Sequence, residues 1–380
     1  MKTLSLFLVS IMILSVMPAV MATSIGSGIT PDIQTEDFAP LVWMCDHRVV
    51  LDDGVQWGRV SQKNQGMLER ANNYAFEGEQ IGWKVLVMDK NGVEKIQDVF
   101  ATIGDSQGAG NDIEVNCDKL GWKPKEIPRS CNARIQEEYL EDFNDDVMEF
   151  YYCTLTVETS ESMYGEYWIT VEALDLDGLS GTMAENEYWF LNPVIALDID
   201  GALTFEDVRP GTDSYSSTLL VGNKADDGSG VMLDMFISGT DFYDSSSSGA
   251  MCPTTNQLSL GAFRYFATSG AYSTATDAQK DSPTPKPINE GIYDVSTVRN
   301  RDTEGYVNIQ RGDHWDRSMY YEAEIIQSGI EVEGPGPAEY YRGNILAPGA
   351  EMALTFKLSL PEPCNGDFDT GSIYFWGEAI

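Results

Sequence analysis

The most regular pattern along the chain is the alternation of apolar with polar or small residues, the period of a β-strand with one buried face. The run 351–360 shows it most cleanly, because Met352, Leu354, Phe356 and Leu358 fall on one face. No segment sustains the 3.6-residue period of an amphipathic helix. Many short strands separated by turn residues predict an all-β protein of antiparallel β-sandwiches. The expected strands lie at 41–45, 81–89, 95–103, 149–157, 166–173, 187–191, 194–199, 216–221, 231–237, 258–266, 319–326, 351–360 and 371–380.

The stretch 202–238 has the densest strand and turn signals in the chain. Two apolar runs, 216–221 and 231–237, lie on either side of a segment rich in Gly, Asn and Asp. Such a segment breaks a strand and turns the chain, so we expect a strand–turn–strand unit of a sandwich. A Pro-Gly pair at 210–211 precedes the first of these strands, and a second pair at 348–349 precedes a later strand. We expect the same turn geometry at both pairs.

The N-terminal residues have the pattern of a secretory signal peptide. Lys2 supplies a positive charge, an apolar run at 4–17 follows, and small residues end at Ala22, so we expect cleavage there and secretion. The run is too short for a transmembrane span, and no membrane span is expected in the mature chain. The predicted organisation is a signal peptide (1–22), a flexible segment (23–37), an immunoglobulin-like sandwich with four cysteines (38–192) and a second sandwich (193–380) with a long polar insertion (267–317).

The immunoglobulin-like assignment of the first sandwich depends on three positions. Tyr151 stands two residues before Cys153, as in the immunoglobulin strand that carries the second cysteine, and Trp83 is a candidate for the core Trp against the disulfide. Cys45 lies much further ahead of Trp83 than the first cysteine of that pattern. We therefore predict tandem immunoglobulin-like sandwiches rather than true immunoglobulin domains.

Six cysteines in a secreted chain predict disulfides. Four fall in the first predicted domain and two in the second, so each domain has an even number. Four cysteines allow three pairings. We favour a short-range bond from Cys117, which lies in the polar, Gly-rich segment 104–127 that we expect to be a loop, to Cys131. The other bond would then join an early strand to a late one. A zinc site is the rival interpretation, but the chain has no CxxC pair and only two His. The favoured disulfides are Cys45–Cys153, Cys117–Cys131 and Cys252–Cys364.

The charge of the chain restricts its partners. With 60 acidic and 24 basic residues, the formal net charge is −36. Such a surface repels nucleic acid and anionic lipid headgroups, so we expect no nucleic-acid partner. It also attracts cations and keeps a protein soluble where salt is high. A hydrophobic content of 42% with 11% aromatic residues is ample for packed cores.

Three turns with the pattern D-x-[D/N]-G, at 89–92, 175–178 and 198–201, are candidates for calcium binding. Calcium needs several hard oxygen ligands around a tight turn, and Gly permits such a turn. None of the three continues to the Glu of an EF-hand loop, and Asp and Gly are also ordinary hairpin residues, so plain turns are the alternative. No other cofactor is expected. The candidate ligands are Asp89, Asn91, Asp175, Asp177, Asp198 and Asp200.

Several segments resemble a known group of sequences. They are GNDIEVNC (110–117), CTLTVET (153–159), YWITVEALDLDG (167–178), EYWFLNPVIALDIDG (187–201), CPTTNQLSL (252–260) and SIYFWGEAI (372–380). With them the chain resembles uncharacterised secreted proteins of small-genome archaea over nearly all of its mature length. The succession of Pro-Gly turn, strand, Asn and strand in the second domain resembles the camelysin and TasA-like fibre-forming β-sandwiches. The resemblance implies a secreted or cell-surface β-protein and carries over no site.

Enzymatic motifs are weak in this sequence. Paired carboxylates for glycoside hydrolysis are not singled out among so many acidic residues. A Ser-His-Asp triad would have to use His47 or His314, the only two His of the chain. Aromatic residues at 315–321 form the best candidate patch for stacking on a glycan, with ordinary core and edge aromatics as the alternative.

We therefore expect a non-enzymatic extracellular or cell-surface protein with a structural or interaction role, such as a surface-layer or fibre component. Its partners would be further copies of itself or other surface proteins, bound through exposed strand edges or through acidic contacts bridged by divalent cations. A secreted adhesin that binds carbohydrate or another ligand through the insertion 267–317 is the alternative. A secreted hydrolase ranks last.

Overall fold

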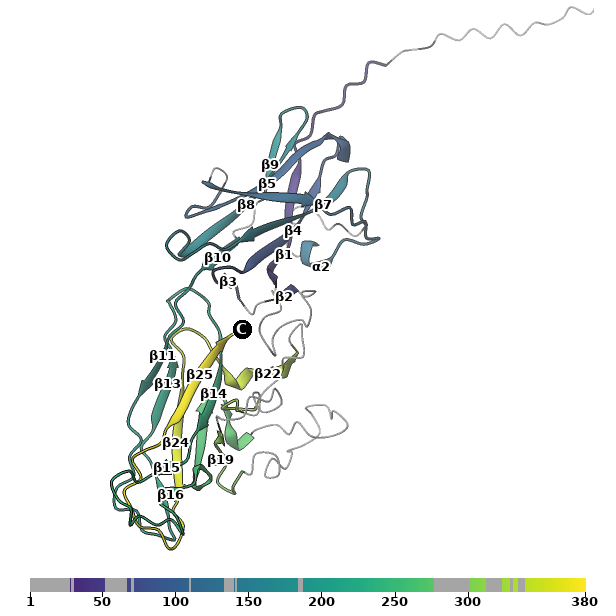
Figure 1. The fold of residues 1–380 in the computed structure, drawn as a ribbon. Helices are drawn as coiled ribbons and strands as arrows, with labels where there is room; N and C mark the ends of the chain where they lie inside the picture. The colour runs from purple at the N-terminus through teal and green to yellow at the C-terminus, as the bar shows by residue number, and fades with distance from the viewer. Residues whose placement is uncertain are drawn as a thin grey trace, which may run out of the picture. The chain divides into compact units, whose positions relative to one another are not determined.

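The computed structural model describes residues 28, 31–51, 67–69, 72–108, 111–132, 140, 142–183, 187–276, 301–311, 323–328, 331–333 and 339–380. The chain divides into two units, residues 1–37 and 38–380. The described part of the second unit is mainly β (Figure 1), and its one α-helix is the short α2 (Arg129–Asn132). This confirms the expected all-β class. Tandem immunoglobulin-like sandwiches and the domain boundary at 192/193 stay predictions.

The strands before residue 192 form one ten-stranded sheet, which curls so that its two ends share a core. Met44 and Trp83 from one end pack in the same cluster as Ile103 and Val171 from the other. In sheet order its strands are β2 (Met67–Glu69), β1 (Leu41–Leu51), β4 (Gln80–Met88), β7 (Met148–Thr156), β6 (Ile113–Lys119), β5 (Ile96–Gly104), β8 (Gly165–Asp175), β10 (Glu187–Leu191) and β3 (Tyr74–Ala75), with β9 (Ser180–Thr182) beside β8.

Strand β6 joins the two halves of this sheet. Its residues 113–116 pair with β5, and its residues 117–119 pair with β7. The expectation of a loop over 104–127 is therefore wrong. The period-2 pattern is present in IEVNCDK, because Val115 is buried between the exposed Glu114 and Asn116, but the Gly-rich and polar residues around it hid this short strand.

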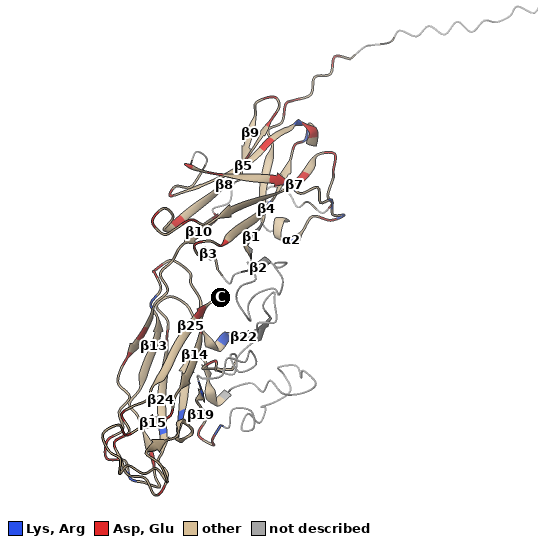
Figure 2. Cartoon of the chain, in the orientation of Figure 1, with Lys and Arg blue, Asp and Glu red and all other residues tan. Residues whose placement is uncertain are grey.

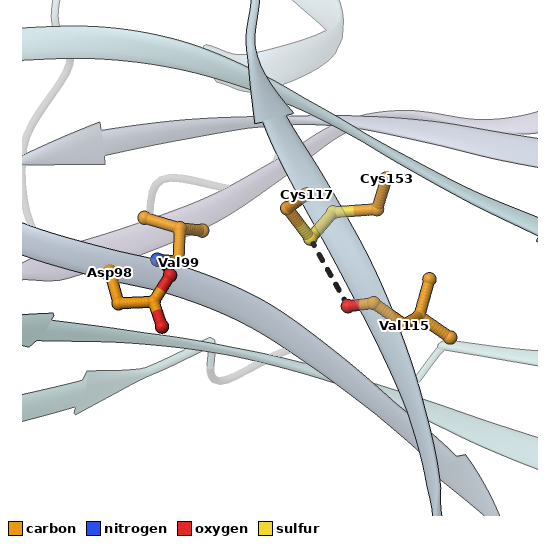
Figure 3. Close-up of a disulfide and its surroundings, with 5 residues drawn as sticks. All are labelled: Asp98, Val99, Val115, Cys117 and Cys153. Carbon is orange, nitrogen blue, oxygen red and sulfur yellow. Dashed lines mark hydrogen bonds between the residues drawn. A yellow bond between two sulfur atoms is a disulfide. The ribbon is translucent and has the colours of Figure 1, made fainter.

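The register of β6 on β7 sets the first disulfide. Cys117 lies directly opposite Cys153 and is bonded to it (Figure 3). Cys153 also pairs in register with the fully buried Trp83 of β4, so Trp83 does pack against a disulfide as expected. The predicted pairings Cys45–Cys153 and Cys117–Cys131 are both wrong, because they assumed that Cys117 lies in a loop.

The second disulfide joins Cys45 of β1 to Cys131 of α2. Both residues are buried in a small cluster with Leu86, Met88 and Phe150, so the bond fixes the helix over one face of the sheet. The third disulfide, Cys252–Cys364, is the predicted one. No cysteine among the described residues is free.

The strands after residue 196 form two larger sheets and two small hairpins. The seven-stranded sheet contains β11 (Leu197–Asp200), β13 (Leu219–Asn223), β24 (Glu351–Ser359), β17 (Phe263–Ser269), β18 (Tyr272–Ser273), β12 (Asp213–Tyr215) and β19 (Val307–Asn308). The four-stranded sheet contains β20 (Gln310–Arg311), β14 (Leu233–Gly239), β23 (Ile345–Leu346) and β25 (Ile373–Ala379). The hairpins pair β15 (Phe242–Tyr243) with β16 (Gln257–Leu258) and β21 (Glu331–Glu333) with β22 (Glu339–Tyr341).

The predicted strand–turn–strand unit connects these two sheets. Strand β13 belongs to the seven-stranded sheet and β14 to the four-stranded one, and their apolar side chains share one core. The connection depends on the fully buried Asn223. Its Nδ2 donates to the carbonyls of Val231 and Leu346, both at 2.9 Å, and its Oδ1 accepts from the amide of Ala225 at 2.9 Å. The buried amide therefore ties together three segments of chain.

Other predicted elements differ in detail. The strand expected at 194–199 begins only at Leu197, and the one at 258–266 is divided by the 3-10 helix η2 (Leu260–Ala262). Of 319–326, the described part contributes an isolated bridge between Glu324 and Phe236. The remaining 3-10 helices are η1 (Val93–Lys95), η3 (Thr274–Thr276) and η4 (Arg342–Asn344).

The shared geometry expected at the two Pro-Gly pairs is confirmed. The amide of Thr212 donates to the carbonyl of Arg209 at 3.2 Å, and the amide of Ala350 donates to that of Ala347 at 2.9 Å. Gly211 and Gly349 both have φ of 76°. A positive φ at the third residue after Pro at the second is the form of a type II turn.

Mapping of the disulfides by mass spectrometry of a non-reduced digest should recover Cys45–Cys131 and Cys117–Cys153. Replacing Cys117 and Cys153 together by Ala opens a loop with a sequence separation of 36 residues, and we expect it to lower the free energy of unfolding by about 2–4 kcal/mol. Recovery of a peptide pair that joins Cys117 to Cys131 would contradict the register of β6.

Candidate functional site

Two of the three predicted calcium turns meet at one end of the ten-stranded sheet. Asp89 directly follows β4, and Asp175 is the last residue of β8. The chain passes from Asp89 through η1 into β5, whose first residue, Ile96, pairs with Asp175. The amide of Leu176 also donates to the carbonyl of Lys95 at 2.8 Å. The register of β5 on β8 therefore brings together two turns that are far apart in sequence.

Each of these turns is organised by its own first Asp. Oδ1 of Asp89 accepts from the amide of Asn91 at 2.8 Å. Oδ1 of Asp175 accepts from the amides of Asp177 at 2.9 Å and Leu179 at 2.7 Å. These are Asx turns, in which the side chain takes the place of a main-chain acceptor. One oxygen of each carboxylate is thus used by its own turn.

The two leading carboxylates are buried, with exposed fractions of 0% for Asp89 and 2% for Asp175. Oδ2 of Asp89 is buried and has no hydrogen-bond partner. Burial raises the pKa of Asp89, the hydrogen bond from Asn91 opposes that change, and the charge of Asp175 raises the pKa further. The nearby Lys95 opposes it weakly and forms its own ion pair with Asp177 at 2.8 Å. Asp89 is therefore in an unfavourable place for a negative charge.

The third turn, predicted at 198–201, is wrong for its first three residues, which belong to an exposed edge strand paired with β13. Asp198 and Asp200 lie on the edge strand β11, and the side chain of Asp198 is 52% exposed. Its neighbour Lys224 lies 3.9 Å away and forms a shorter ion pair with Glu351 at 3.2 Å. In the described part of the chain no group of three or more His, Cys, Asp or Glu side chains surrounds a common metal position. As calcium ligands, all six predicted residues stay predictions.

Lys357 forms a charged cluster that the sequence analysis missed. Its Nζ lies 3.1 Å from Asp213, 3.1 Å from Asp302 and 3.0 Å from Glu304, and its side chain is only 11% exposed. The rings of Tyr215 and Tyr306 lie within 6 Å of the ammonium group and pack edge-on against each other (Lys357 to ring centroids 5.7 and 5.9 Å). One cation thus forms ion pairs with three carboxylates from two distant segments of chain.

The electrostatics of this cluster hold every member in its charged form. Burial opposes the charge of Lys357, but hydrogen bonds to Glu304, Asp302 and Asp213 outweigh it and raise the pKa of the amine. The pKa of Asp213 is lowered by hydrogen bonds from Ser359 and Lys357, and that of Glu304 by hydrogen bonds from Lys357 and Tyr215. A protonated amine is no nucleophile, and carboxylates of low pKa are poor general acids. The cluster is arranged for stability.

The strand edges are the other exposed feature of the second half of the chain. Strand β11 ends the seven-stranded sheet and carries Asp198 and Asp200. Strand β25 pairs with β14 on one side, and no other described strand pairs with it. It has no charged residue from Ile373 to Gly377, and Tyr374 is 51% exposed. Figure 2 shows acidic residues on many strand ends and loops of the described chain, so an uncharged edge is unusual here.

The remaining sequence candidates lie outside the described residues. This holds for the side chain of His47, for His314 and for the aromatic patch at 315–321. Of the insertion 267–317, the structure describes residues 267–276 and 301–311. No helix in the described part of the chain has the length and apolar character needed to cross a membrane.

Comparison with known proteins gives distant structural likenesses. No family model matches the chain, and no curated protein matches it. A crystal structure of a DUF4466 family protein from Parabacteroides merdae is similar over 85% of this chain and 99% of its own, with 12% identity and a TM-score of 0.23. The C-terminal domain of the AgI/II polypeptide BspA of Streptococcus agalactiae is similar over 90% and 96%, with 11% identity and a TM-score of 0.27. Likeness at this level assigns no family and carries no function.

Replacing Lys357 by Met should destabilise the protein most between about pH 5 and 10. The carboxylates with lowered pKa contribute stability above their ordinary pKa near 4 and lose it as the pH falls further. The contribution of Lys357, whose pKa is raised, is lost only at strongly alkaline pH. We expect Tm at pH 7 to fall by roughly 2–5 °C, measured by thermal unfolding across pH.

Lys224→Met is the matched control, because the side chain of Lys224 is 47% exposed and such ion pairs contribute little. Equal effects of the two substitutions at pH 7, or an effect of Lys357→Met that stays constant down to pH 2, would contradict this account of the cluster.

Proposed function

We propose that the chain is a secreted, non-enzymatic interaction protein that associates with further copies of itself through the open edge of β25. The uncharged edge of β25 carries the proposal. Disulfides support the extracellular location, because all three bonds lie in described residues and such bonds persist in oxidising surroundings. The signal-peptide pattern before residue 23 supports it as well.

An open strand edge binds another strand unless something protects it. The β11 edge carries Asp198 and Asp200, charges of the kind that natural sheets use to block such pairing. Strand β25 has no such protection between Ile373 and Gly377. Ile373 and Phe375 pack against the core, and on the opposite face Trp376 stacks on Phe236 of β14 with ring centroids 5.6 Å apart, so both faces of the strand contribute to its attachment to β14.

A second copy of β25 is the partner that this edge fits. In an antiparallel pairing centred on Phe375, Tyr374 of each copy lies opposite Trp376, which gives two cross-strand aromatic pairs. The same register places Glu378 opposite Ser372, so no two carboxylates face each other. The rest of the surface opposes association, because each copy has a net charge of −36. Pairing is therefore expected to strengthen with salt, which screens this repulsion.

The expected result is a dimer whose formation depends on β25. We expect the mature protein to show reversible dimers at roughly 100 μM in about 0.5 M NaCl, and fewer in low salt. Tyr374→Asp adds a charge to the edge and should raise the Kd of the dimer at least tenfold, about 1.4 kcal/mol. Sedimentation velocity or size-exclusion chromatography with light scattering measures both, with EDTA and then with millimolar calcium, since cations could also bridge acidic surfaces.

Tyr243→Asp is the control, because Tyr243 is another exposed strand Tyr, at 40% against 51% for Tyr374, and the change in net charge is the same. A monomer under all of these conditions would overturn self-association. A dimer weakened equally by both substitutions would place the interface elsewhere.

A further inference from the structure

Asp89 and Asp175 are two buried acidic residues whose turns meet at one end of the ten-stranded sheet. Their strands, β4 and β8, end at the same place because β5 pairs with β8 in the register of Ile96 on Asp175. The charge of Asp175 acts directly on Asp89, and both side chains have an exposed fraction of 2% or less. Two buried carboxylates that act on each other repel unless a positive charge compensates them.

The neighbouring groups compensate this charge in part and leave one buried carboxylate oxygen without a hydrogen-bond partner. The main-chain amides of the two turns bond to one oxygen of each carboxylate, Oδ1 of Asp89 and Oδ1 of Asp175. The ammonium group of Lys95 acts on Asp89 and forms an ion pair with Asp177 at 2.8 Å. Oδ2 of Asp89 remains buried without any hydrogen-bond donor. Burying a carboxylate oxygen without a hydrogen bond costs free energy. A positive ion bound beside it would offset that cost.

We propose that a divalent cation binds between Asp89 and Asp175, with Oδ2 of Asp89 as one of its ligands. The ligands are hard oxygens, the type that calcium and magnesium prefer. Two carboxylates are enough for a partly hydrated ion, which completes its coordination with water or main-chain carbonyls. This proposal is independent of the pairing of β25, because it concerns only the ten-stranded sheet.

Isothermal titration calorimetry with CaCl2 and, separately, with MgCl2 tests the site on the mature protein after dialysis from EDTA. We expect one binding event per chain for at least one of the two ions, lost or weakened at least tenfold in Asp89→Asn. The Asn side chain keeps the size and the Oδ1 acceptor of Asp, so the turn is preserved. Thermal unfolding should show a cation-dependent rise of roughly 5 °C at a hundredfold excess over the Kd, absent from Asp89→Asn.

Asp198→Asn is the matched control, because it removes the same charge from a D-x-D-G sequence that lies exposed on the edge strand β11. It should keep both the binding event and the thermal shift. Equal loss in the two variants would show diffuse attraction of cations to the acidic surface and would overturn the proposal. So would the absence of binding in the wild-type protein, which would leave a carboxyl proton as the compensating charge.

A second measurement covers the case in which Asp89→Asn fails to fold. Crystals of the wild-type protein grown with calcium or magnesium should show density for an ion within about 2.0–2.6 Å of Oδ2 of Asp89 and an oxygen of Asp175. Crystals that contain the cation elsewhere but not here would overturn the proposal.

Discussion

The exchange of partners within β6 is the constraint on which the first half of the structure depends. The strand begins as a neighbour of β5 and ends as a neighbour of β7, so it connects the two halves of the ten-stranded sheet, whose side chains share one core. The disulfide Cys117–Cys153 lies at the point of exchange, beside the buried Trp83. The disulfide, the strand register and the core packing therefore all hold β6 in place beside β7. The Asp89 and Asp175 turns meet because β5, the other neighbour of β6, pairs with β8.

The parts of this fold that the sequence predicts are those where one local pattern decides the outcome. Strands β4 and β24 have long runs of alternating or apolar residues, and the Pro-Gly turns depend only on the conformations of Pro and Gly. Strand β6 has only seven residues in Gly-rich surroundings, so its alternation is too short to stand out. Cysteine pairing depends on register between strands, which no local pattern contains. Because the sequence predicts a loop in place of β6, two of the three predicted disulfide pairings are incorrect.

The same distinction applies to the candidate sites. The D-x-[D/N]-G pattern locates the turns at Asp89 and Asp175, but their meeting depends on how β5 pairs with β8. The Lys357 cluster gives no signal at all, because Asp302 lies 55 residues away from Lys357 and reaches it only through the tertiary fold.

The third disulfide has a mechanical consequence. Cys252 and Cys364 are separated by 112 residues, and tension along the chain passes through the sulfur–sulfur bond instead of through the residues between them. The enclosed segment contains β17 and β24, the centre of the seven-stranded sheet, together with the polar insertion. If the protein were pulled from its ends, roughly 380 Å of chain would stay unextended until that bond was reduced. This covalent loop therefore limits how far a pulling force can unravel the second half of the chain.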